Sequence, residues 1–136
     1  MNFLTVLIAL LAFGFLIFVH ELGHYIAARL TGIKVYEFSI GMGPKLVWYE
    51  SKKTKIIYAL SMIPIGGYVA MVGENGESDD PNSFDKKPAW QRLIITAAGP
   101  FVNILTGFIA MVILTAFINV GSTVIHDFEV PKEGTV

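Results

Sequence analysis

Two long apolar runs, separated by a polar and interrupted stretch, organise this chain. Residues 3–19 and residues 93–120 contain no charged side chain. A helix needs about 20 apolar residues to cross the ~30 Å hydrocarbon core of a bilayer. The second run is long enough by itself, and the first becomes long enough if its helix continues to residue 30. The pattern therefore predicts two transmembrane helices, at about residues 3–30 and 90–120.

A cleaved signal peptide is the alternative interpretation of the first run. Such a peptide begins with basic residues and ends at a cleavage site of small residues of the A-x-A type. No basic residue precedes Phe3, and no site of this type closes the run. Gly32 lies just past the predicted helix, where a helix end is expected, and Arg29 suits the last turn. We therefore favour a retained membrane helix.

The region between the helices is rich in strand-like segments. Four of them follow one another, at residues 35–40, 45–50, 55–63 and 64–72. The turn-forming sequence SKKT joins the second to the third, which predicts a hairpin, and the fourth opens with Pro64 and the pair Gly66–Gly67. The sequence thus predicts a membrane protein that is mainly α-helical, with a cytoplasmic or membrane re-entrant β-hairpin region, residues 33–72, between two transmembrane helices.

Two polar segments complete the chain. Residues 73–89 are acidic, contain Gly, Pro, Asn and Ser, and have almost no large apolar side chains. This composition is typical of a mobile surface loop. Residues 121–136 are too few to form a domain of their own.

The overall composition limits the chemistry that the chain can perform. Hydrophobic residues make up 54% of it, and its net charge of -1 offers no basic surface for nucleic acid. It has no cysteine, which excludes disulfides and thiolate metal ligands. A metal ion would have to be held by His, Asp, Glu or amide groups.

The positions of the basic residues predict the orientation in the membrane. Eight of the ten Lys and Arg residues lie within residues 31–92, and only Lys132 lies beyond the second predicted helix. Basic residues near helix ends favour the cytoplasmic side. We therefore expect residues 31–92 on the cytoplasmic side and both termini outside. The alternative is that these lysines simply solvate a loop.

The sequence HELGH near the end of the first run carries candidate chemistry. His20 and His24 are four residues apart, so a helix places both imidazoles on one face, with their Cβ atoms about 5–6 Å apart. Two neutral imidazoles can bind one zinc ion, and Glu21 beside them could accept a proton from water that the metal activates. This is the H-E-x-x-H pattern of zinc peptidases.

The depth of this motif favours a functional role. His20 lies 17 residues after Phe3, or about 26 Å along a helix, just inside the cytoplasmic edge of the hydrocarbon. A charged group at the bilayer centre costs about 2.5–3.5 kcal/mol on insertion scales. A shared metal site would explain why all three ionisable residues lie at this depth. The alternative is that they lie among the headgroups and are solvated there.

The second run contains an unusual stretch, AAGPFVN. Gly99 and Pro100 lie inside the predicted span, and Asn103 follows one turn later. A helix broken at this depth is tolerated where it faces protein or a water-filled cavity. The small residues Ala97, Ala98 and Gly99 equally allow a close helix contact with an ordinary proline kink. Both interpretations remain open on these residues alone.

Several ordered motifs together resemble the bacterial site-2 protease family, the zinc metalloproteases that cut substrates within the membrane. The resemblance runs from about Phe3 to Val120, through HELGH, GIKVYEFSIGMGPKL, PIGGYVAM, F-x-x-K-P-x-W-Q-R and AAGPFVN. It implies that His20 and His24 are zinc ligands and that Glu21 is the general base. It also implies that Asn103 is a polar residue near the catalytic centre. The segment around Gly66, Gly67 and Tyr68 resembles the family's re-entrant hairpin, which is thought to meet an unwound substrate strand.

The sequence departs from the family at the third zinc ligand, an aspartate in an L-D-G motif on a later membrane helix. No L-D-G occurs here, and the aspartates lie in the polar loop or the tail, at Asp79, Asp80, Asp85 and Asp127. His126 is expected on the opposite membrane face from His20. We therefore expect the third ligand outside this chain, which would be the N-terminal portion of a longer protease, with residues 121–136 leading into a PDZ-like region. A divergent or inactive short member is the alternative.

The resemblance implies zinc-dependent intramembrane proteolysis in the bacterial plasma membrane. Substrates would be single-span membrane proteins, such as anti-sigma factors, or remnant signal peptides. A non-catalytic scaffold embedded in the membrane is the alternative from another functional class. Two spans without internal repeats argue against a transporter.

Overall fold

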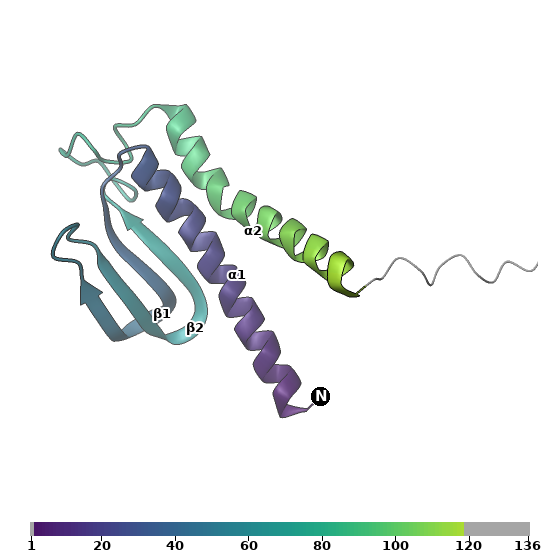
Figure 1. Cartoon of the computed structure of the whole chain (residues 1–136). Coiled ribbons are helices and arrows are strands. Elements are labelled where there is room, and N and C mark those ends of the chain that lie inside the picture. Colours follow the sequence, from purple (N-terminus) through teal and green to yellow (C-terminus); the bar gives the residue numbers. More distant parts are fainter. Residues whose placement is uncertain (1, 119–136) are drawn as a thin grey trace, which may run out of the picture. The chain divides into compact units, whose positions relative to one another are not determined.

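The computed structural model describes residues 2–118, which contain two helices and two strands (Figure 1). The element order is α1 (Phe3–Leu30), β1 (Val35–Glu50), β2 (Ile57–Met71) and α2 (Ala89–Ile118). Both helices are long and apolar enough to cross a membrane, as the sequence pattern predicts. The interpretations of His126, Asp127 and residues 121–136 fall outside the described residues.

One compact unit ends at Ile104 and a second begins at Leu105. The candidate chemistry lies in the first unit. Within the second, the apolar side chains of α2 from Leu105 to Phe117 are exposed, and the Thr115 hydroxyl donates to the carbonyl of Met111 at 3.0 Å. Such an exposed apolar surface suits contact with lipid.

Defined caps close both ends of α1. At the start, the Asn2 side chain accepts a hydrogen bond from the amide of Thr5 at 3.0 Å. At the end, the Thr31 hydroxyl donates to the carbonyl of Ala27 at 2.8 Å, and Gly32 follows with φ 72°. These contacts satisfy backbone groups that a helix end leaves unpaired.

The strands β1 and β2 form one antiparallel sheet, which joins the four predicted segments into two long bent strands. Residues 35–40 pair with residues 67–71 on one edge, and residues 37–40 also meet residues 57–60 on the other. Residues 47–50 then pair with residues 57–60 across the predicted hairpin. Turning the strands at their bends requires glycine, because Gly41 and Gly66 have φ values of 85° and 82°.

A small apolar core joins the sheet to the C-terminal end of α1 and the N-terminal end of α2. Its fully buried members are Ala28, Ile33, Ile56 and Ile95, each no more than 2% exposed. They come from α1, the segment before β1, the segment before β2, and α2. Since Ile95 belongs to this core, the first turns of α2 are fixed against α1 and the sheet.

The helix α2 continues through Pro100 without a break. The broken helix considered from the sequence is therefore wrong, and the close helix contact is what forms. Pro100 removes one backbone donor and crowds the carbonyl of Thr96, yet α2 continues on both sides of it. Gly23 on α1 packs so tightly against α2 that a β-carbon there would lie 2.7 Å from the carbonyl oxygen of Ala98.

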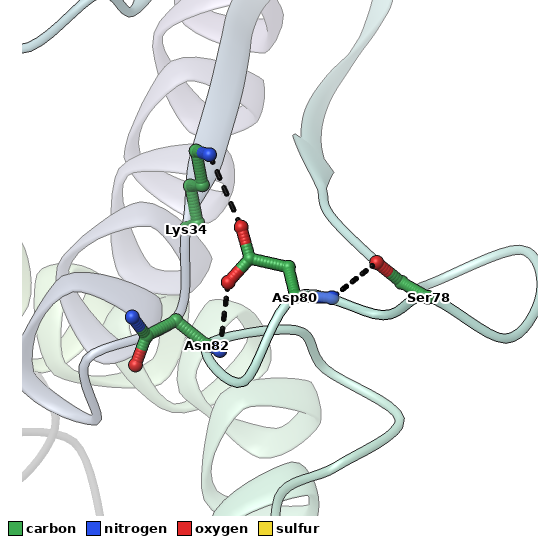
Figure 2. Close-up of polar contacts among 4 residues, drawn as sticks. All are labelled: Lys34, Ser78, Asp80 and Asn82. Carbon is green, nitrogen blue, oxygen red and sulfur yellow. Dashed lines mark hydrogen bonds and ion pairs between the residues drawn. The ribbon is translucent and has the colours of Figure 1, made fainter.

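The acidic segment between β2 and α2 is anchored in its second half rather than free. The Lys34 amide donates to the carbonyl of Asn82 at 3.0 Å, and the Phe84 amide donates to the carbonyl of Val72 at 2.7 Å. Figure 2 shows Asp80 between Lys34, Asn82 and Ser78. The Lys34 ammonium lies 3.1 Å from Asp80 Oδ2, and the Asn82 amide donates to Oδ1 at 2.9 Å.

This anchor is expected to be insensitive to pH near neutrality. The Asn82 amide and the Lys34 ammonium lower the pKa of Asp80. A carboxyl with a lowered folded-state pKa stabilises fully above its ordinary pKa and loses that contribution as pH falls through the lowered value. Protection of the Asn82 amide from hydrogen exchange, corrected for intrinsic rates, should therefore stay constant between about pH 8 and 5. Asp80→Asn should weaken it at every pH in that range.

Asp79→Asn is the matched control, since Asp79 is exposed and carries the same charge one residue earlier. Equal loss of protection in both variants would show that general charge, and not the contacts of Asp80, orders the segment.

Candidate metal centre

The helix α1 places the two HELGH histidines as a pair with their Nε2 atoms facing each other. These atoms are 3.2 Å apart, and the rings meet edge to face with centroids 4.8 Å apart. A tetrahedral zinc ion with Zn–N bonds of about 2.0–2.1 Å requires a nitrogen separation of about 3.3 Å. The geometry of His20 and His24 therefore fits two ligands of one metal ion.

A backbone carbonyl of α2 fixes the tautomer of His24. Its Nδ1 lies 2.7 Å from the carbonyl oxygen of Ile95. A carbonyl can only accept, so Nδ1 must carry the proton and Nε2 keeps a free lone pair. This is the usual arrangement of a metal-binding histidine, whose outer nitrogen donates to a second group.

Asn103, also on α2, holds the ring of His20. Its Nδ2 lies 3.2 Å from His20 Nδ1, while its Oδ1 is buried and has no hydrogen-bond partner among the described residues. Turning the amide over would place Oδ1 against a protonated Nδ1 and free Nε2 of His20 for the metal. Zinc binding would select that orientation, because it matches the tautomer of His24.

Glycine at position 99 makes room for the histidine pair. A β-carbon on Gly99 would lie 2.8 Å from His20 Nε2 and would also collide with His24 Nε2. Ile95, Gly99 and Asn103 are spaced by four residues, so one face of α2 supplies both histidine partners and the gap between them. The sequence drew attention to Gly99 and Asn103, but it gave no signal for the carbonyl of Ile95.

Glu21 faces a cavity of about 530 Å³ that is also lined by His24. The wall opposite includes consecutive residues of β2, from Gly67 to Met71, and Glu74 and Phe84 come from the following segment. A β-carbon on Gly67 would lie 2.9 Å from both Glu21 Cγ and the carbonyl oxygen of Ser39. Gly67 therefore lets the strand approach the carboxylate closely.

The other two hairpin residues singled out from the sequence have different places. Gly66 lies at the bend of β2 against the side chain of Met42. Tyr68 lines the cavity, and its hydroxyl donates to Glu37 Oε1 at 2.6 Å, where Lys45 also binds at 2.7 Å. Burial by itself raises the pKa of Glu37, but the hydrogen bonds from Lys45 and Tyr68 outweigh it and lower that pKa overall. The sequence gave no signal for this buried group.

No third metal ligand joins the pair within residues 2–118, where no group of three or more His, Cys, Asp or Glu side chains could hold an ion. Asp80 and Asp85 serve the anchored segment, where Asp85 Oδ2 accepts from the amide of Ser78 at 3.3 Å. The expectation that the third ligand lies elsewhere in a longer protein stays a prediction.

Known proteins with similar sequences agree on one description. The family model of peptidase family M50 matches residues 8–135. A Clostridium acetobutylicum protein named "putative zinc metalloprotease" is 50% identical over 105 residues, which cover 77% of this chain and 30% of that protein. A protein of the same name from Fusobacterium nucleatum is 48% identical, and the match covers 79% of this chain and 31% of that protein. Another from Thermotoga maritima is also 48% identical, and the match covers 73% of this chain and 20% of that protein. The chain thus spans less than a third of the length of these relatives.

Proposed function

The chain belongs to peptidase family M50, and from that premise we propose that it supplies two metal ligands and the general base of an intramembrane zinc peptidase. The observation that carries the proposal is the pair of Nε2 atoms 3.2 Å apart, with the outer nitrogen of each ring next to a group on α2. The third ligand would come from the part of the protein beyond this chain.

The residues of this chain would divide the work as follows. His20 and His24 would bind zinc, which when bound would act as a Lewis acid toward water and the peptide carbonyl. Glu21 would accept a proton from water and later donate it to the leaving amine. Ile95 and Asn103 would keep the imidazoles oriented.

The edge of β2 offers a place for the substrate. Within residues 2–118, residues 67–71 pair with β1 on one edge only, and the same residues line the cavity beside Glu21. An extended peptide could add to the free edge as a further strand. Amides inside a helix are already hydrogen-bonded, so a transmembrane substrate must unwind before it can bind there. From the resemblance to the site-2 protease family, we propose single-span membrane proteins, such as anti-sigma factors or remnant signal peptides, as substrates.

We place the protein in the bacterial plasma membrane, with residues 31–92 on the cytoplasmic side. The basic residues between the helices support this orientation.

Zinc removal tests the proposal in the complete protein that carries this chain. Cleavage of a single-span substrate in detergent should stop when a chelator strips the metal and return when Zn²⁺ is added back. Undiminished cleavage by protein shown to be free of zinc would contradict the proposal. The 136-residue chain alone should lose most of its zinc on dialysis, because two imidazoles are an incomplete ligand set.

A non-catalytic scaffold is the competing function, and it would not require the paired Nε2 atoms or the glycine between them. Its distinguishing result would be a complete protein that binds membrane proteins but neither retains zinc nor cleaves them.

A further inference from the structure

The outer ribbon of the sheet, residues 45–50, exposes apolar side chains on both of its faces. Leu46, Val47, Trp48 and Tyr49 are consecutive and each is 60–66% exposed. Because successive strand residues point to opposite faces, neither face of this ribbon is covered by the described part of the chain. Water is an unfavourable environment for such a ribbon, which is also a sheet edge.

The connection that follows, residues 51–56, is an ordered turn rich in lysine, which we call the lysine tip. The Ser51 amide donates to the carbonyl of Ile56 at 3.0 Å, and the Lys55 amide donates to that of Ser51 at 2.8 Å. Lys55 adopts a left-handed conformation with φ 59°, which is unusual for a residue with a β-carbon. The backbone of the turn is therefore well defined, and the turn lies on the side of the sheet away from α1 (Figure 1).

The charge of the lysine tip is largely uncompensated. Lys52, Lys53 and Lys55 are exposed. Lys55 lies 3.7 Å from Glu50, while Lys52 and Lys53 form no ion pair within residues 2–118. The tip thus carries three ammonium groups, of which one is paired with a carboxylate, at the end of an apolar ribbon.

We propose that the outer ribbon and the lysine tip dock into the cytoplasmic leaflet, with the lysines on the phosphates of anionic phospholipids. The order of residues along the chain matches the order found across a membrane–water interface: apolar side chains come first, then Trp48 and Tyr49, then the lysines. Anionic headgroups complement the net positive charge of the tip. The inference rests on the membrane placement given under Proposed function, since α1 and α2 would cross the same bilayer.

Docking there would fix the depth of the substrate-binding edge. Four segments lie side by side in the sheet. Their order is the outer ribbon, residues 57–60, residues 37–40 and, beside the cavity, residues 67–70. Three strand spacings, or about 14 Å, thus separate the lipid contact from the strand next to Glu21. A leaflet that holds the ribbon would hold that strand at a constant level relative to the metal ligands.

Tryptophan fluorescence tests this contact, because the chain has only Trp48 and Trp90. The 136-residue chain with Trp90→Phe reports on the ribbon, and the chain with Trp48→Phe reports on the start of α2. Each is placed in vesicles of phosphatidylcholine alone or mixed with phosphatidylglycerol. Quenching by lipids brominated along the acyl chain gives the depth, and quenching by aqueous acrylamide gives the exposure to water.

We expect shallow lipid quenching of Trp48 and less acrylamide quenching when phosphatidylglycerol is present. Each lysine should favour the docked tip by about fivefold in anionic vesicles. Combining Lys52→Gln, Lys53→Gln and Lys55→Gln should abolish the difference between the two vesicle types. The control Lys86→Gln with Lys87→Gln removes two positive charges outside the tip and should leave the difference intact.

Two results would overturn the inference. One is a Trp48 that lipid bromines do not reach while Trp90 is quenched, which would mean that the helices insert but water, a second copy or another protein covers the ribbon. The other is a phosphatidylglycerol effect that the tip substitutions leave unchanged. Neither readout uses cleavage, so failure of this inference is distinguishable from failure of the proposed peptidase function. Circular dichroism of each variant establishes that it has folded.

Discussion

In the complete protein, Glu21→Gln is expected to lower cleavage of a membrane substrate by about 10²–10⁴-fold, the range that general acid–base catalysis contributes. Glutamine has nearly the same shape, so it should keep the contact with Gly67 and the wall of the cavity. It cannot accept a proton from water. Zinc content should therefore stay unchanged while cleavage is lost.

Glu74→Gln is the matched control for this experiment. Glu74 lines the same cavity but is exposed, and its Oε2 accepts a hydrogen bond from the amide of Met71 at 3.3 Å. Its substitution should cost far less activity than that of Glu21. Full activity of Glu21→Gln would remove Glu21 from the role of general base, and loss of zinc from that variant would show a structural defect instead.

Gly99→Ala should have the second largest effect, a loss of zinc affinity of at least about tenfold, comparable with losing an outer partner of a metal ligand. The added methyl group would press on Nε2 of both His20 and His24. Moving α2 away from α1 to relieve this pressure would break the hydrogen bond between His24 Nδ1 and the carbonyl of Ile95. Zinc per protein, measured by mass spectrometry after dialysis, is the readout.

The direction of the Gly99→Ala effect distinguishes crowding at the histidine pair from a change in helix propensity. Alanine is a better helix former than glycine by about 1 kcal/mol, so propensity alone predicts stabilisation. Gly107→Ala on the same helix is the control, since a β-carbon there meets no atom within 4 Å. It should retain zinc and activity. Full zinc in the Gly99→Ala protein would contradict the assigned crowding at the histidine pair.

The parts of the structure that depend on nearby residues could be predicted from the sequence. The span of α1 and the common face of His20 and His24 follow from helix periodicity, which acts over four residues. The hairpin around SKKT follows from local turn composition. Each of these features is decided by residues close together in the chain.

The rest depends on contacts between distant segments. The carbonyl of Ile95 meets His24 from 71 residues away, and no local pattern indicates which carbonyl will do so. The same limit applies to the two-sided pairing of residues 37–40 and to the buried carboxylate of Glu37. At Pro100 local reasoning left open both a broken helix and a close contact between continuous helices, and only the contact of Ala98 with Gly23, 75 residues away, decides between them.

The separation between the histidines and their partners also determines when this centre can form during synthesis. Both histidines leave the ribosome early, on α1, whereas Ile95 and Asn103 follow 71 and 83 residues later. Until α2 has been made and inserted, neither imidazole has the neighbour that orients it. A nascent chain with only its first helix in the bilayer would therefore carry the HELGH residues without an organised centre.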